Sequence, residues 1–183
     1  MLNWIIKFIT AAVLSHAFFL WVGPHIVMSK LDKDLKRAQT EYRPECGERW
    51  VAGVVYSNPD CLSDVASSRR PNPDFIYTLI PYDLKKGNLL VSAPVPSDDR
   101  YWSIHAHNRN TDAFYKITNT EIDGDRFKFL VTRDRNLRSD LSVAYASSNK
   151  GLILFRLTMK NFKEYSILDE FRRSTNRKYV ENL

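Results

Sequence analysis

Residues 69–115 of the chain read RRPNPDFIYTLIPYDLKKGNLLVSAPVPSDDRYWSIHAHNRNTDAFY. Three segments within this stretch, 75–80, 89–93 and 101–107, are rich in aromatic and branched apolar residues, which fit the pleated surface of a β-sheet. The sequences between them are rich in Asn, Asp, Gly and Pro, which favour turns because they bond to nearby backbone, allow positive φ or fix φ. The stretch therefore predicts three β-strands joined by short loops.

The segment 101–107 alternates apolar and polar side chains, and successive side chains of a strand point to opposite faces of its sheet. One face carries Trp102, Ile104 and Ala106, and the other carries Ser103, His105 and His107. We expect the first face to join the core and the second to lie on the solvent side. The aromatic residues expected in the same core are Phe114, Tyr115, Phe127 and Phe129.

The rest of the chain after the N-terminus continues the pattern of short strands and turns. Further strands are expected at 50–56, 114–118, 127–132, 141–146 and 152–159, with a hairpin-like Asp-Gly-Asp turn at 123–125. A short amphipathic helix is expected near 165–171. It would be followed by a basic, solvated tail containing Arg172, Arg173, Arg177 and Lys178. We therefore predict a mainly β fold: an antiparallel β-sandwich or barrel-like domain with an N-terminal transmembrane helix and a short C-terminal helix.

An uncharged run at 8–28 precedes this domain and is 21 residues long, which matches the length that a helix needs to cross a bilayer. A cleaved signal peptide is the alternative, but 23–25 and 27–29 are poor cleavage sites. We expect a retained anchor at 1–28, a polar juxtamembrane helix or linker at 29–49 and a β-rich domain at 50–183.

Two observations bear on the side of the membrane on which the domain lies, and they point to opposite sides. Lys30, Lys33, Lys36 and Arg37 follow the apolar run, and a positive-inside count alone would place the domain in the cytoplasm. Cys46 and Cys61, the two cysteines of the chain, could instead form a disulfide in an oxidising compartment. The alternatives are two free thiols or a zinc site. We expect the disulfide, and with it a periplasmic domain.

The chain carries 27 Lys and Arg against 21 Asp and Glu among its 183 residues, so its formal net charge is +6. This charge favours anionic surfaces such as phospholipid head groups or lipopolysaccharide. The basic residues are scattered and no nucleic-acid motif is present, so we expect no nucleic-acid partner. The chain also lacks a nucleophile elbow, a phosphate loop and a metalloprotease helix motif, and we expect no cofactor.

Several short motifs together resemble a bacterial family called domain of unknown function 1254. The motifs are PNPD at 71–74, DLKKG at 83–87, VSAP at 91–94, RYWS at 100–103 and NRNTD at 108–112, the last leading into Phe114-Tyr115. The segments 151–156 and 167–172 resemble the family's final strand and closing helix. The anchored, single-domain form is similar to a subgroup described as predicted integral membrane proteins.

The resemblance implies that a separate protein supplies a second domain. Longer relatives in the family continue into a region called domain of unknown function 1214, and we expect a partner that resembles it. The family offers no established catalytic residues to carry over to this chain.

His105 and His107 are the strongest candidates for chemistry, since an i, i+2 pair on a strand places both imidazoles on one face, as a metal site requires. A third ligand would come from Asp74, Asp112, a glutamate or a cysteine. The structural alternative is that the two histidines are part of the polar face of a half-buried strand.

Arg109, Asn110 and Asp112 follow the same strand and could bind an anionic or sugar-like ligand, with Arg109 as a forked donor. The structural alternative is a turn held by Asn and Asp side chains. Taken together, the sequence predicts a non-catalytic binding or assembly domain of the bacterial inner membrane. The alternatives are a metal-assisted hydrolase that uses His105, His107 and Asp112, or a lipid- or glycan-binding module that uses Arg109.

Overall fold

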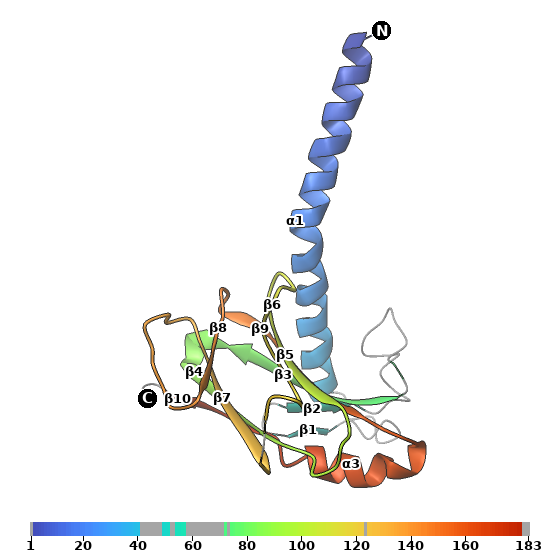
Figure 1. Cartoon of the computed structure of the whole chain (residues 1–183). Coiled ribbons are helices and arrows are strands. Elements are labelled where there is room, and N and C mark those ends of the chain that lie inside the picture. The colour runs from blue at the N-terminus through green and yellow to red at the C-terminus, as the bar shows by residue number, and fades with distance from the viewer. Residues whose placement is uncertain are drawn as a thin grey trace.

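The structure is a computed structural model of the chain, and it describes residues 2–40, 49–51, 54–57, 72, 74–122 and 124–180. It consists of a long helix, α1 (Leu2–Thr40), and a domain of two β-sheets with a short helix, α3 (Tyr165–Arg172), at one end. Figure 1 shows the N-terminal half of α1 projecting away from the sheets, while its C-terminal half runs alongside them.

Within the described residues, the larger sheet has six strands in the order β1-β2-β3-β9-β5-β6. Their bounds are β1 Arg49–Val51, β2 Val54–Ser57, β3 Phe75–Asp83, β9 Lys150–Thr158, β5 Trp102–Asn108 and β6 Ala113–Thr118. Every neighbouring pair in this sheet is antiparallel. β9 lies between β3 and β5, so a strand from late in the chain completes the sheet that earlier strands begin.

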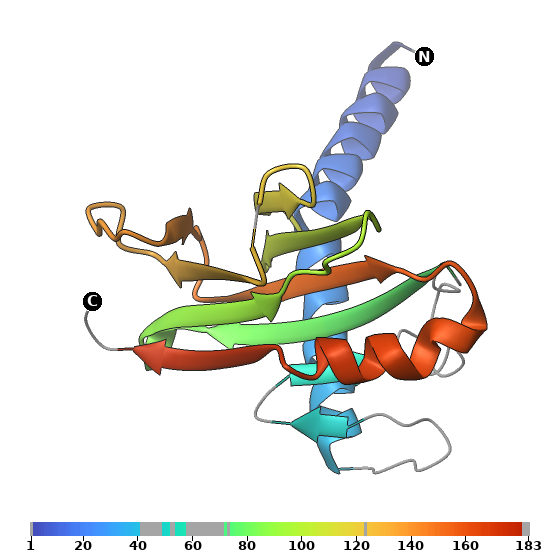
Figure 2. The ribbon, with the colours of Figure 1, turned by 60° about the horizontal axis from the view of Figure 1, so that its bottom comes forward.

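The smaller sheet has four described strands in the order β10-β4-β7-β8. Their bounds are β10 Asn176–Val180, β4 Asn88–Pro94, β7 Arg126–Thr132 and β8 Ser142–Tyr145. The pair β7–β8 is parallel, whereas the other two pairs are antiparallel. Figure 2 shows β10 following α3 and lying beside β4. A mainly β, sandwich-like domain with one long N-terminal and one short C-terminal helix was predicted, and the structure confirms it.

The core lies between the two sheets and is made mainly from residues of strands β3 to β9. Trp102, Ile104 and Ala106 of β5 are each at most 2% exposed, as the alternation predicted. Phe127 and Phe129 are also buried, and Phe114 and Tyr115 pack against the core from its edge. The 3₁₀ turn η2 (Leu84–Lys86) then leads into β4 through Gly87, whose φ of +117° suits a residue without a Cβ.

Three sequence predictions differ from the structure in detail. The segment 50–56 forms two short strands, β1 and β2, rather than one. The turn at 123–125 does not join a hairpin, because β6 belongs to the larger sheet and β7 to the smaller one. The chain therefore crosses between the layers at this point. A local turn signal cannot distinguish these two outcomes.

The expected basic tail is the third difference. The side chain of Arg172 is buried against the Asp169 carboxylate and donates to the backbone carbonyl of Tyr77. Arg177 belongs to β10 and donates to the carbonyl of Pro81. Burial lowers the pKa of both guanidinium groups. These two arginines therefore connect the C-terminal segment to β3, where the sequence suggested a solvated helix end.

Helix α1 is continuous through Pro24, and its two halves have different surroundings. Its large apolar side chains up to Trp21 are mostly exposed, whereas residues 22–25, 28, 29, 31 and 32 are partly buried. Met28 and Leu31 pack against Leu79 and Leu152 on the outer face of the larger sheet. Among the described helices, this one is long and apolar enough to cross a membrane, over 3–33.

Candidate functional site

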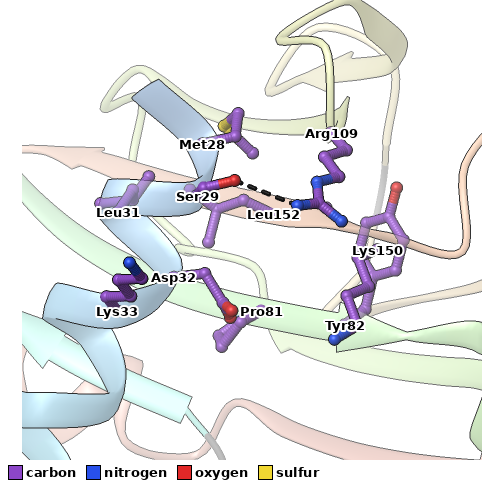
Figure 3. Close-up of a pocket in the computed structure, with 11 residues that line it drawn as sticks. Met28, Ser29, Leu31, Asp32, Lys33, Pro81, Tyr82, Arg109, Lys150 and Leu152 are labelled. Carbon is purple, nitrogen blue, oxygen red and sulfur yellow. Dashed lines mark hydrogen bonds between the residues drawn. The ribbon is translucent and has the colours of Figure 1, made fainter. Parts of the chain in front are cut away.

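A cavity of about 360 Å³ lies where the second half of α1 passes the larger sheet. We call it the α1–sheet cavity. Met28, Ser29, Leu31 and Asp32 line it from α1, and Pro81, Tyr82 and Leu152 line it from β3 and β9. Arg109 reaches into this space from the loop after β5, as Figure 3 shows. The site therefore combines apolar side chains with charged ones.

The loop that presents Arg109 is fixed by the buried side chain of Asn108. The Asn108 Oδ1 accepts hydrogen bonds from the backbone N–H of Ser147 at 3.0 Å and from the N–H of Ser148 at 3.2 Å. Within the loop, the Asn108 N–H donates to the carbonyl of Asp112, and Thr111 has a φ of +72°. A β-branched residue rarely adopts this conformation, so the surrounding hydrogen bonds must hold the loop in place.

Arg109 joins this loop to α1. Its guanidinium donates to the Ser29 Oγ at 3.0 Å, and its backbone N–H donates to the Ser148 Oγ at 3.0 Å. No carboxylate pairs with Arg109 in the part of the chain that the structure describes. Lys150 also lines the cavity, and its ammonium group lies 3.6 Å from a carboxylate oxygen of Asp83. Arg109 can therefore hold an anion without giving up an existing ion pair among these residues.

A second cavity, of about 410 Å³, adjoins the other side of Arg109 and lies closer to the N-terminal half of α1. Trp21, Pro24 and His25 line it from the helix, and Asn110 and Asp112 line it from the loop. Asn110 donates through its amide nitrogen to the Asp112 carboxylate. Its Oδ1 is buried and has no hydrogen-bond partner among the described residues. The three predicted ligand-binding residues therefore do lie together, next to the helix.

His105 and His107 lie on the outer face of β5, as the alternation predicted. Their rings stack at a centroid distance of 6.1 Å, with an interplanar angle of 15°. The His105 Nε2 lies 3.2 Å from a nitrogen of the Arg156 guanidinium, which can only donate, so Nε2 accepts this hydrogen bond. Burial first, then the charges of Arg156, His107 and Lys116, lower the pKa of His105. The hydrogen bond from Arg156 and the lowered pKa both favour the neutral form of His105.

This face is less open to solvent than the sequence suggested. Ser103 is fully buried and accepts a hydrogen bond at 3.0 Å from the Nε of Arg156, which also stacks over the ring of Phe75. The His107 Nδ1 lies 3.0 Å from the carbonyl oxygen of Thr111 and therefore donates to it. Neighbouring side chains and the loop thus occupy much of the polar face.

The described residues contain no group of three or more His, Cys, Asp or Glu side chains placed to hold a metal ion. The carboxylate of Asp112 accepts a hydrogen bond from Asn110 rather than joining the two histidines. Cys46 and Cys61 lie outside the described residues, so their disulfide stays a prediction. The metal-assisted hydrolase also stays a prediction, and it would need ligands beyond those that the structure brings together.

Sequence reasoning singled out Arg109 but missed its neighbours Ser29, Lys150 and Gly151. Ser29 directly precedes Lys30, the first charged residue after the apolar run, which was a usable signal. No sequence signal marked Lys150 and Gly151, because they reach the site through the pairing of β9 with β3 and β5. A Cβ at Gly151 would overlap the His107 carbonyl and the Tyr82 hydroxyl, so only glycine fits there without displacement.

Comparison with known proteins places this fold in a family. The sequence pattern of the family described as "Protein of unknown function (DUF1254)" matches residues 56–177. The chain therefore belongs to this family, as the short motifs between 71 and 112 predicted. No protein with curated information matches the chain.

Two solved structures are similar to it. The crystal structure of the VPA0106 protein from Vibrio parahaemolyticus is 13% identical, with a TM-score of 0.55. The match covers 88% of this chain but 38% of the Vibrio chain, so this chain spans well under half the length of that protein. A crystal structure of a putative uncharacterized protein from Burkholderia cenocepacia is 11% identical, with a TM-score of 0.44. That match covers 57% of this chain and 31% of the other. The first likeness supports the fold alone.

Proposed function

We propose that this chain is a single-pass protein of the bacterial inner membrane whose β-sandwich works as a non-catalytic binding or assembly domain. The observation that carries the proposal is the continuity of α1. Its exposed apolar half passes without a break into the half that packs on the larger sheet through Met28 and Leu31. A helix of this kind would hold the sandwich against the membrane surface in one orientation.

We propose further that the domain lies in the periplasm. The support is the expected bond between Cys46 and Cys61, which requires an oxidising compartment. The lysines after the uncharged run argue for the opposite side, so topology needs a direct measurement. Alkaline phosphatase fused after Leu183 should be active in intact cells. A fluorescent reporter that matures only in the cytoplasm should stay dark at the same position. The reverse pair of results would place the domain in the cytoplasm.

The partner that we propose is a separate protein resembling domain of unknown function 1214. The support is that the shared fold covers 38% of the Vibrio chain, so in that protein the fold is joined to a larger remainder. An assembly domain should bind its partner in a fixed ratio. Affinity purification of the full chain in mild detergent should therefore recover a second protein in constant stoichiometry. Repeated recovery of the chain alone, from cells grown under several conditions, would count against an assembly role and leave the membrane anchor untouched.

A further inference from the structure

We propose that the α1–sheet cavity binds the phosphate group of an anionic membrane lipid. This inference rests on the proposed membrane anchor and specifies one ligand of the binding domain. Three observations support it: the position of the cavity along α1, the chemistry of its wall, and the neutral hydrogen-bond partner of Arg109.

The position of the cavity places it at the membrane surface. The fully exposed part of α1, residues 3–21, covers about 29 Å as a helix, which is close to the thickness of the hydrocarbon core of a bilayer. The α1 wall of the cavity begins with Met28 and continues through Ser29 to Lys33. If this part of α1 spans the bilayer, Met28 lies about 10 Å beyond its end, and the cavity therefore lies at the level of the lipid head groups. Lipid head groups would then be present beside the cavity at high local concentration.

The wall of the cavity suits an amphiphile with a negative charge. Met28, Leu31, Pro81 and Leu152 supply apolar surface from both sides. The charged residues in the wall are the cations Lys33, Arg109 and Lys150 and the acid Asp32, so cations exceed acids by three to one. A cavity of about 360 Å³ is at the small end of the range of ligand cavities. This size suits a head group, while the acyl chains would lie along the exposed apolar side chains of α1.

Arg109 is the residue that should contact the phosphate. Its hydrogen-bond partner across the cavity, the Ser29 Oγ, is neutral, so an incoming phosphate would not have to displace a carboxylate. Arginine presents a planar fork of donors that matches phosphate oxygens, and a bidentate pair of this kind is stronger than a neutral hydrogen bond. Lys150 would add a second positive charge from β9, next to its existing contact with Asp83.

The proposal is tested with the full chain in nanodiscs of phosphatidylcholine containing phosphatidylglycerol. Native mass spectrometry of the released protein measures which lipid stays bound. We expect one retained phosphatidylglycerol per chain, and a loss of at least tenfold in its retention for Arg109→Gln. The control Arg135→Gln removes the same charge from an exposed loop and should change retention less than twofold. Arg109→Lys keeps the positive charge but removes the planar set of guanidinium donors, so its loss of phosphatidylglycerol retention should be intermediate.

The comparison of variants decides the outcome. Equal losses for Arg109→Gln and Arg135→Gln would mean general charge attraction and would overturn the proposal. The same conclusion follows if a folded Arg109→Gln variant, checked by circular dichroism, keeps full retention. Lys150→Gln tests the same site independently and should lower the retention of phosphatidylglycerol severalfold.

A second arm separates lipid from soluble anion. Titration of the detergent-solubilised chain with inorganic phosphate should give no saturable binding in the concentration range where phosphatidylglycerol binds. Comparable affinity for both would assign the cavity to a soluble phosphate and overturn the lipid proposal. The anchor itself is measured separately by membrane extraction, so its failure is distinguishable from the failure of the lipid site.

Discussion

Gly151 is the residue on which the meeting of β3, β5 and β9 most directly depends. An added Cβ would collide with the backbone carbonyl of His107, and backbone cannot move away as a side chain can. We expect Gly151→Ala to lower the free energy of unfolding by about 3 kcal/mol, the upper part of the usual range for overpacking. Denaturant titration in detergent would measure the loss.

The matched control is Gly23→Ala. A Cβ at Gly23 meets nothing within 4 Å, and alanine is the better helix former. This variant should be neutral or slightly more stable. If both substitutions have the same small effect, the strands do not approach each other at Gly151 as described.

Arg172 gives a second prediction at this scale, because a buried charge depends on its partners. The Asp169 carboxylate accepts hydrogen bonds from Arg172 at 2.8 and 2.6 Å. Asp169→Ala would leave the buried guanidinium without this carboxylate and should cost about 3 kcal/mol of stability. Asp99→Ala breaks the contact with Lys160, in which the aspartate side chain is 93% exposed, and should cost less than about 0.5 kcal/mol. Denaturant titration measures both losses, and similar denaturation midpoints for the two variants would argue against a buried Arg172.

His105 predicts a pH dependence whose sign follows from its surroundings. Its pKa in the folded chain is lowered from the ordinary value of 6.5, so the fold prefers the neutral imidazole. As the pH falls, the unfolded chain therefore binds the proton before the folded chain does. The free energy of unfolding decreases as the pH falls from about 6.5 to the pKa of His105 in the folded chain. NMR titration of the His105 ring should show its midpoint below 6.5. His105→Gln should reduce the loss of stability in acid, and an unchanged pH profile in this variant would contradict the assignment.

At the scale of the strands, the position of each in its sheet predicts how fast its amides exchange. β9 is flanked on both sides by β3 and β5, whereas β8 and β10 lie at the edges of the smaller sheet among the described strands. Central strands open only in large unfolding events, while edge strands fray locally. Hydrogen exchange measured by mass spectrometry should therefore show the slowest exchange in β9. Equal protection of β10 and β9 would indicate that the C-terminal edge is covered by another surface.

The elements also show what a single sequence can reveal. The alternation of Trp102, Ile104 and Ala106 with polar residues gave the core face of β5, because a period of two is a local property. The neighbours of that strand could not be read in the same way. The pairing of Ile104 with Phe155 joins positions far apart in the sequence, and only the packed core selects it. The turn at 123–125 was misassigned for the same reason.

The candidate site was predictable to a similar extent. Arg109, Asn110 and Asp112 stood out because polar residues with turn chemistry follow a clear strand, and the structure does place them together. Ser29 and Lys150 come to the same site through helix packing and through a non-local strand pair. The position of Ser29 at the end of the apolar run marks it as a boundary residue, but neither its contact with Arg109 nor the place of Lys150 can be read from nearby sequence, since both depend on the complete fold.

At the scale of the whole molecule, the exposed half of α1 predicts where the protein resides. Leu14 and Phe18 are exposed, so replacing them should leave the sandwich intact. Each aspartate near the centre of a spanning helix costs about 3 kcal/mol on insertion scales. The double variant Leu14→Asp, Phe18→Asp should therefore be released from membranes by alkaline carbonate, which should not extract the unmodified chain.

The control for this experiment is Lys128→Asp, which changes the charge by the same two units on the exposed surface of β7. It should stay in the membrane fraction. Release of the unmodified chain by carbonate would instead mean that α1 does not act as an anchor.

The packing of Met28 and Leu31 against the larger sheet has one more consequence. A domain on a flexible tether samples a wide volume above its membrane, but one attached to its own helix keeps a set height and a set tilt. In the membrane-anchored form that we propose, its search for other molecules would be two-dimensional, along the bilayer. A second protein carried by the same membrane would then meet it at a high effective concentration, so even weak individual contacts could sustain a complex.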